Sequence, residues 1–160
     1  MIPAFVGLVL VADGGHSWPA AIVFGAAGVT DQIDGWLARR WQAESRFGKI
    51  ADPLADRLMI DAAVILLWHA GRLPWVGLAI PARDVALVAG YKLVVERGYD
   101  FSVNFAGKAA TWLLYASLAF ILVTREGTAW PRWIFWAGFA LAAVSLVGYL
   151  LKARREVKPA

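Results

Sequence analysis

Long apolar segments separated by turn residues constrain this chain more than any other feature of its sequence. A helix needs about twenty apolar residues to cross the hydrocarbon core of a bilayer, and five segments come near that length. They cover approximately residues 18–40, 49–70, 73–96, 108–123 and 130–151. The residues between them include Gly, Pro, Asn and Asp, which interrupt regular structure. The pattern predicts an all-α fold and a polytopic membrane protein.

A sixth and shorter apolar run covers residues 1–12. As a helix it would rise only about 18 Å, which is less than the hydrocarbon thickness of about 30 Å. The run has no basic residues before it and no small-residue cleavage site after it, so we do not expect removal as a signal peptide. We therefore expect about six transmembrane helices in a single domain over residues 1–160, the first helix being short or truncated.

The composition agrees with a membrane protein. Hydrophobic residues make up 60% of the chain, and charged residues make up 18%, below the average of about 25% for soluble domains. The sequence has no cysteine, which excludes disulfides and thiolate metal sites. The net charge of +4 does not indicate a nucleic-acid partner, because no stripe of basic and aromatic residues accompanies it.

Basic residues gather on one side of the expected topology. The other side carries only Arg72, Arg125 and Arg132 in its connections. Because cytoplasmic loops are enriched in Lys and Arg, the basic side is predicted to face the cytoplasm in a multi-pass protein of the cell membrane. The basic side carries Arg39, Arg40, Arg46, Lys49, Arg97, Lys108, Lys152, Arg154, Arg155 and Lys158.

Tryptophans mark the opposite side. Those near the expected outer helix ends are Trp18, Trp68, Trp75, Trp130 and Trp133. Tryptophan rings favour the membrane–water interface, so we interpret these residues as an anchoring belt. His16 and His69 fall on the same outer side, and we expect no catalytic role for either.

Four aspartates interrupt the apolar pattern at the basic side of two neighbouring segments. Asp31 and Asp34 are three residues apart, and Asp52 and Asp56 are four apart, so each pair shares one helix face. The polar residues between the segments predict an antiparallel hairpin in which the four carboxylates converge. Four anions in a membrane protein repel one another unless a cation lies among them. Oxygen-only ligands favour Mg²⁺ or Mn²⁺, with Ca²⁺ as an alternative, and four carboxylates can bridge two ions.

Small residues and one arginine accompany these aspartates. Gly35 and Ala38 lie next to the first pair, and Gly48 lies one turn before the second. Residues without bulk leave room for a large group close to the backbone, and the guanidinium of Arg39 can bind phosphate. We interpret the whole set as a pyrophosphate site at the membrane surface.

Two other interpretations stay open at this point. The aspartates could cap helices or form ion pairs with Arg39, Arg40, Arg46 and Arg57, a role that also suits Asp61 and Asp84. The cluster could instead belong to a cation transporter or a proton relay. Such proteins tend to place ionisable groups near the membrane midplane and to break helices there, whereas this cluster lies at one membrane face.

The stretch from residue 31 to residue 56 reads D-x2-D-G-x2-A-R-x8-G-x3-D-x3-D. This pattern resembles the signature of the CDP-alcohol phosphatidyltransferases, which are integral membrane enzymes of phospholipid synthesis. The segments "IPAF" at 2–5, "ARD" at 82–84 and "GKAAT" at 107–111 are similar to the bacterial phosphatidylglycerophosphate synthase and cardiolipin synthase branch. Family members usually have a longer N-terminus, so we expect that the chain starts late or is truncated.

The resemblance implies a six-helix enzyme, often a homodimer, with a site open to the cytoplasm. It implies transfer of a phosphatidyl group from CDP-diacylglycerol to an alcohol, with release of CMP and with two divalent cations, Mg²⁺ or Mn²⁺, as cofactors. Asp56 would also be the catalytic base on the acceptor hydroxyl. The metal ligands would be Asp31, Asp34, Asp52 and Asp56. The CDP-binding residues would be Asp31, Asp34, Gly35, Ala38, Arg39, Gly48 and Asp52.

The acceptor alcohol is specified less well. Arg83 is the most informative candidate, because an ionisable residue in an apolar helix is a functional candidate, although pairing with Asp84 would explain it equally. A basic set fits glycerol 3-phosphate, which would give phosphatidylglycerophosphate and is the acceptor we expect. It also fits phosphatidylglycerol, giving cardiolipin, and inositol phosphate. The acceptor-binding candidates are Arg83, Lys92, Arg97, Lys108 and Thr111.

Overall fold

A computed structural model describes the backbone of residues 1–40, 48–86 and 105–156. This part of the chain contains helices and turns and no strand, which confirms the predicted all-α class. The α-helices are α1 (Ile2–Val11), α2 (Trp18–Arg40), α3 (Gly48–His69), α5 (Phe105–Val123) and α6 (Trp130–Glu156). Two short 3₁₀ helices, η1 (Asp13–Gly15) and η2 (Trp75–Leu78), lie in connections, and residues 79–86 are again α-helical.

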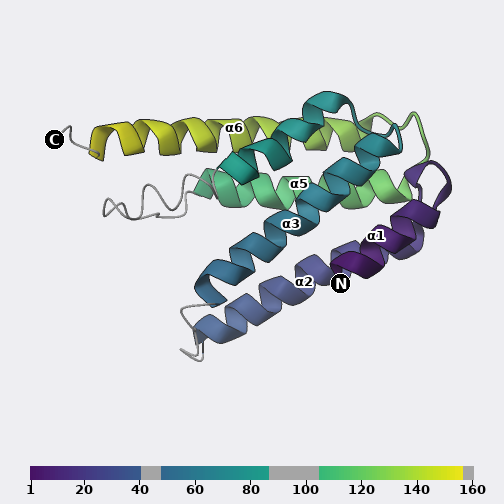
Figure 1. The fold of residues 1–160 in the computed structure, drawn as a ribbon, viewed down its shortest axis with the longest axis horizontal. Coiled ribbons are helices and arrows are strands. Elements are labelled where there is room, and N and C mark those ends of the chain that lie inside the picture. Colours follow the sequence, from purple (N-terminus) through teal and green to yellow (C-terminus); the bar gives the residue numbers. More distant parts are fainter. Residues whose placement is uncertain (41–47, 87–104, 157–160) are drawn as a thin grey trace.

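The helices form two antiparallel pairs (Figure 1). One pair is α5 with α6, and the other is α2 with α3, which crosses the first pair at an angle. Helix α1 packs against both α2 and α3. Helix α5 contacts α2 and α3 as well as its own partner α6. The connections α1–α2, α3–η2 and α5–α6 meet at one end, which we call the distal end. The opposite end, where α2 and α6 end and α3 and α5 begin, we call the site end.

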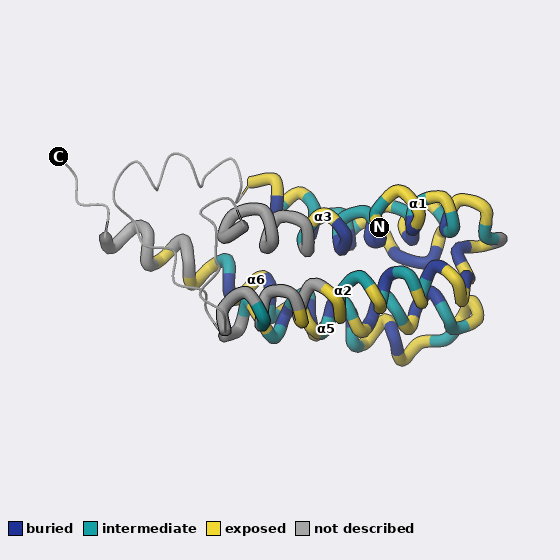
Figure 2. Tube along the Cα trace, turned by 90° about the horizontal axis from the view of Figure 1, so that it is seen from below, coloured by how far each residue is buried: buried dark blue, intermediate teal, exposed yellow. Residues whose placement is uncertain are grey.

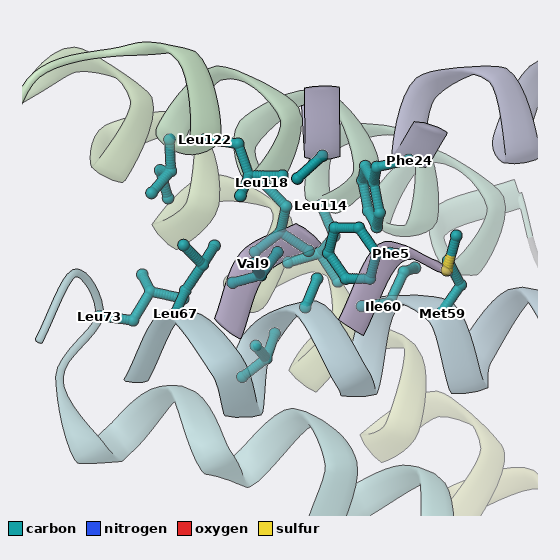
Figure 3. Packing of buried hydrophobic residues seen from close by; sticks show 14 of the residues in the cluster. Phe5, Val9, Phe24, Met59, Ile60, Leu67, Leu73, Leu114, Leu118 and Leu122 are labelled. Carbon is teal, nitrogen blue, oxygen red and sulfur yellow. The ribbon is translucent and has the colours of Figure 1, made fainter. Parts of the chain in front are cut away.

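The core lies where α1, α2, α3 and α5 meet, on the distal half of the bundle (Figures 2 and 3). Phe5 of α1 and Phe24 of α2 are fully buried, with ring centroids 5.2 Å apart. Phe24 also lies against Tyr115 of α5, with ring centroids 4.9 Å apart. Leu67 of α3 and Leu118 of α5 belong to the same buried cluster and have no exposed surface. These aromatic contacts fix the position of α2 relative to its neighbours.

Hydrophobic length varies among the described helices. One stretch, Trp130–Gly148 of α6, is long and apolar enough to cross a membrane by length and composition. Shorter apolar stretches are Ile2–Val11, Trp18–Thr30 and Gly107–Val123. Helix α2 itself has 23 residues, but its apolar part ends at Thr30 because Asp31 starts a polar half. The transition from apolar to polar therefore falls within one continuous helix.

The observed bounds follow the sequence pattern closely, with two differences. The third long segment was predicted as one helix from residue 73, but the described part begins with η2 and becomes α-helical only at residue 79. Pro74 is extended and precedes η2, and a proline cannot donate the backbone hydrogen bond that a helix interior needs. Pro81 stands in the first turn of the following helix, where its missing N–H is tolerated. Helix α6 also continues to Glu156, beyond the predicted end at residue 151.

Arg72 joins the connections at the distal end. Its Nη2 donates hydrogen bonds to the carbonyl oxygens of Ile121 at 2.7 Å and Thr124 at 2.6 Å. Its Nη1 donates to the carbonyl oxygen of Gly14 at 3.4 Å. Carbonyls at a helix C-terminus lack partners within the helix, so this buried guanidinium caps the end of α5. The Nε2 atom of His16 lies 3.1 Å from the carbonyl oxygen of Val123, at the distal end, as predicted.

Two glycines of α2 provide a matched test of this packing. A Cβ atom on Gly28 would lie 2.9 Å from Cε1 of Tyr115, whereas a Cβ atom on Gly25 would meet nothing within 4 Å. We expect Gly28→Ala to lower the free energy of unfolding by about 1–2 kcal/mol, because overpacking outweighs the gain in helix propensity. Gly25→Ala should be neutral or stabilising by up to about 1 kcal/mol. Thermal unfolding in detergent measures both, and equal effects of the two substitutions would contradict this packing.

Candidate active site

The eight signature positions lie on two contacting helices. Helix α2 carries its five positions in its C-terminal half, and α3 carries its three positions in its N-terminal half. Both halves lie at the site end (Figure 1). The positions are Asp31, Asp34, Gly35, Ala38 and Arg39 on α2, and Gly48, Asp52 and Asp56 on α3. The structure describes their backbone, and their side chains lie outside the described part.

The backbone confirms the helical register that the sequence predicted. At about 100° per residue, Asp31 and Asp34 are about 60° apart around α2, and Asp52 and Asp56 are about 40° apart around α3. Each pair therefore occupies one face of its helix. The antiparallel hairpin of α2 and α3 is also observed. Convergence of the four carboxylates stays a prediction.

The donor set suits a hard divalent cation. Among the side chains that the structure describes, no group of three or more His, Cys, Asp or Glu residues could hold a metal ion. The four signature aspartates are outside that set and offer only carboxylate oxygens. Oxygen ligands without imidazole or thiolate favour Mg²⁺ or Mn²⁺ over softer metals. The residues present at these positions therefore fit the cations that the resemblance implies.

An ion pair links α3 to the helical segment 79–86 directly beyond the signature. Nη1 of Arg57 lies 2.8 Å from Oδ1 of Asp84, and both atoms are within hydrogen-bonding distance. Nη1 of Arg83 lies 3.7 Å from the same oxygen. The Asp84 side chain is 8% exposed, so the pair is partly shielded from solvent and stronger than a surface pair. The suggestion that Asp84 forms an ion pair is confirmed, and Arg57 is one of its partners.

Asp61 lies one helical turn after Arg57 on α3. Its Oδ1 atom is buried and accepts no hydrogen bond within the described structure. The residue is close enough to Asp84, Arg57 and Arg83 to interact with them electrostatically. Sequence analysis suggested ion pairs for Asp84 and Asp61 but did not place both carboxylates with Arg57 and Arg83 in one group, because Arg57 and Asp84 are separated by 27 residues.

The acceptor candidates are spread over three parts of the chain. Arg83 is 14% exposed and belongs to the charged group around Asp84. Lys108 is exposed near the start of α5, and Thr111 lies one turn later. The hydroxyl of Thr111 donates a hydrogen bond to the carbonyl oxygen of Gly107 at 3.0 Å. The remaining two candidates, Lys92 and Arg97, lie outside the described residues.

The link between α3 and segment 79–86 can be measured with a double-mutant cycle. We expect Arg57→Gln and Asp84→Asn to show a coupling free energy of about 1–2 kcal/mol, because each substitution removes the charge on which the other depends. A second cycle with Arg57→Gln and Asp61→Asn should give a smaller coupling, because Oδ1 of Asp61 accepts no hydrogen bond. Unfolding midpoints in detergent provide the measurement. A coupling near zero between Arg57 and Asp84 would contradict the structure.

Comparison with known proteins gives consistent matches along the chain. The sequence profile of the CDP-alcohol phosphatidyltransferase family matches residues 1–144. The cardiolipin synthase (CMP-forming) of Streptomyces coelicolor is 34% identical over 98% of this chain and 79% of the relative. The CDP-diacylglycerol–glycerol-3-phosphate 3-phosphatidyltransferases of Escherichia coli K12 and Shigella flexneri are 34% and 32% identical. Each of these two alignments covers 98% of this chain and 90% of the relative.

The profile match includes the whole signature and both helices that carry it. The relatives share about a third of their residues with this chain over almost its full length. The all-helical architecture, with its apolar helices, is that of a polytopic membrane protein. The chain belongs to the CDP-alcohol phosphatidyltransferase family and is an enzyme that transfers phosphatidyl groups.

Proposed function

We propose that this enzyme transfers the phosphatidyl group of CDP-diacylglycerol to glycerol 3-phosphate, forming phosphatidylglycerophosphate and releasing CMP. The observation that carries the proposal is the complete signature, in helical register on two contacting helices at one end of the bundle. The names of the Escherichia coli and Shigella flexneri relatives support glycerol 3-phosphate as the acceptor.

The polarity of α2 supports a site at the membrane boundary. CDP-diacylglycerol has a charged nucleotide and two apolar chains, so its pyrophosphate belongs where lipid meets water. Helix α2 is apolar up to Thr30 and polar from Asp31 onward, which provides that boundary within one helix. Basic residues are concentrated at the site end, which favours a cytoplasmic orientation of the site in the cell membrane.

We assign the divalent cations to the four aspartates. Asp31 and Asp34 would hold them from α2, and Asp52 and Asp56 would hold them from α3. When bound, two Mg²⁺ or Mn²⁺ ions neutralise negative charge on the pyrophosphate and on the departing CMP. Bound cations would also offset the mutual repulsion of the four carboxylates.

The small residues and the arginine of the signature would bind the nucleotide. Gly35, Ala38 and Gly48 have little or no side chain, so the CDP group can approach the helix backbones at these positions. Arg39 would donate hydrogen bonds to the phosphates, a role that the planar guanidinium performs with two parallel N–H groups. These residues orient the pyrophosphate so that the acceptor approaches opposite to the CMP oxygen.

Asp56 would be the general base. The hydroxyl oxygen of the acceptor forms a bond to the phosphorus that carries diacylglycerol, and the bond from this phosphorus to the bridging oxygen of CMP breaks. The proton of the hydroxyl passes to the Asp56 carboxylate. A hydroxyl ionises far above neutral pH, so a positioned base is needed at the moment of attack. No covalent enzyme intermediate is required.

The acceptor would be held by basic side chains. Arg83 is the first candidate, because the ion pair of Asp84 with Arg57 connects its helix to α3, which also carries Asp56. Lys108 and Thr111 share one side of α5 near the site end and form a second candidate pair. Lys92 and Arg97 remain further candidates. The homodimer that the resemblance implies also stays a prediction.

Phosphatidylglycerol is a second candidate acceptor. The observation in its favour is the Streptomyces coelicolor relative, which is named a CMP-forming cardiolipin synthase and is as similar to this chain as the Escherichia coli relative. Both acceptors carry a primary hydroxyl on a glycerol unit that also bears a phosphate group. The same aspartates would serve either reaction, and the difference would lie in the acceptor-binding residues.

A panel of acceptors tests the reaction directly. Purified protein with CDP-diacylglycerol and Mg²⁺ or Mn²⁺ should release CMP on addition of glycerol 3-phosphate, and phosphatidylglycerophosphate should appear in equal amount. EDTA should abolish this release, and renewed addition of either metal should restore it. If CMP is released with phosphatidylglycerol but not with glycerol 3-phosphate, phosphatidylglycerol is the acceptor. If no alcohol leads to CMP release, the proposed reaction is wrong.

Substitution of Asp56 tests its role as the base. Asp56→Asn should lower kcat by about 10²–10⁴-fold, because an amide cannot accept the proton. Asp61→Asn on the same helix provides a matched control, because it removes a carboxylate outside the signature and should keep most of the turnover. Full activity of the Asp56→Asn enzyme would exclude Asp56 as the base.

A further inference from the structure

A cavity of about 320 Å³ lies at the distal end, away from the signature. It is formed by the connection that follows α3, the end of α5, the α5–α6 connection and the first turn of α6. This volume is at the lower limit of the range of about 300–1,000 Å³ that small-molecule pockets occupy. The polar residues that line it are Arg72, Thr124, Arg125, Glu126, Thr128 and Arg132.

The arginines of this cavity have an unusual distribution. Arg72, Arg125 and Arg132 are the only Lys or Arg residues in the three distal connections and the adjoining first turn of α6. With the site end facing the cytoplasm, as proposed above, the distal end belongs to the side where basic residues are normally depleted. All three nevertheless line the same cavity. Headgroup anchoring alone would not require them to share one cavity.

Arg72 supplies a fixed cation. Three of its N–H groups donate to the carbonyl oxygens of Gly14, Ile121 and Thr124, which holds the buried guanidinium against the cavity wall. Arg125 lies in the α5–α6 connection and Arg132 lies in the first turn of α6. Both are more exposed than Arg72 and line the same cavity. The guanidinium groups repel one another, and the single carboxylate of Glu126 offsets only part of this charge. A bound anion would offset the remainder.

The surroundings favour an anion at the level of lipid headgroups. Trp133 of α6 is 73% exposed, and Trp75 of η2 is exposed to the same extent, as expected for rings at the membrane interface. A smaller cavity of about 190 Å³ shares Ala70 with the arginine-lined cavity. Its lining is mainly apolar and includes Val9, Leu10 and Leu66. A polar cavity beside an apolar one suits a group that carries both a phosphate and a hydrocarbon chain.

We propose that the arginine-lined distal cavity binds a phosphate-bearing anion. Guanidinium groups recognise phosphate oxygens through paired N–H groups, and three guanidiniums around one cavity provide that recognition from several directions. The phosphate can come from a lipid headgroup or from free phosphate, and the two sources differ in whether a hydrocarbon chain contributes to binding. This site is separate from the aspartate signature, and its occupation does not depend on the proposed reaction.

A titration in detergent tests the proposal without measuring turnover. The probes are dihexanoyl phosphatidic acid, inorganic phosphate and, as a zwitterionic reference, dihexanoyl phosphatidylcholine. The thermal unfolding midpoint should rise with phosphatidic acid, and the midpoint shift gives the apparent Kd. The double substitution Arg125→Gln with Arg132→Gln should raise this Kd at least tenfold, since two exposed charges are lost from the lining while the Arg72 cap is kept.

A charge of the opposite sign in the same cavity provides the matched control. Glu126→Gln removes the only carboxylate of the lining, so it should lower the Kd several-fold, whereas general damage to the connection would raise it. Equal response to phosphatidic acid and inorganic phosphate would support recognition of the phosphate group from either source, and response to phosphatidic acid alone would support a lipid site. The proposal is overturned if the arginine substitutions leave the Kd unchanged, or if Glu126→Gln weakens binding as they do.

Discussion

The position of Asp31 within α2 is the constraint on which the rest of this structure depends. Carboxylates are costly in the hydrocarbon region, so the apolar part of the helix must end where the aspartates begin. This transition follows Thr30 and divides a continuous helix into a part for the lipid and a part for water. The start of α3 reaches the same end of the bundle, which brings the second pair of aspartates to the same boundary.

The core on the distal half explains how this boundary is held in place. Phe24 is fixed between Phe5 and Tyr115, and Gly28 allows Tyr115 to approach α2 one turn before Asp31. Packing in this region is dense and apolar, so it resists rotation of the helix. Rotation would move Asp31 and Asp34 together, because they share a face. Aromatic contacts with α1 and α5 therefore determine how the α2 face that carries positions 31 and 34 is turned.

Much of this arrangement could be predicted from sequence because its signals are local. Helix length, turn residues and the spacing of aspartates each depend on neighbouring positions, and the bounds of α2 and α3 agree with the prediction within a residue or so. Features that join distant positions could not be predicted. The sequence suggests several arginines as partners of Asp84 but does not select Arg57, which lies 27 residues away, and the distal cavity needs two separate connections to meet. The break at η2 was also not predicted, because the apolar pattern continues through Pro74 whereas the helix does not.

Whether the signature aspartates pair with arginines or bind cations depends on which positive charges are available to them. If arginines were the counter-ions of the aspartates, Arg57 would be a natural partner, because it follows Asp56 directly on α3. In the structure its guanidinium lies 2.8 Å from Asp84, a largely buried carboxylate that itself requires a positive partner. A side chain committed to Asp84 offers less charge to the signature. Divalent cations would supply positive charge that Arg57 does not give to the four aspartates.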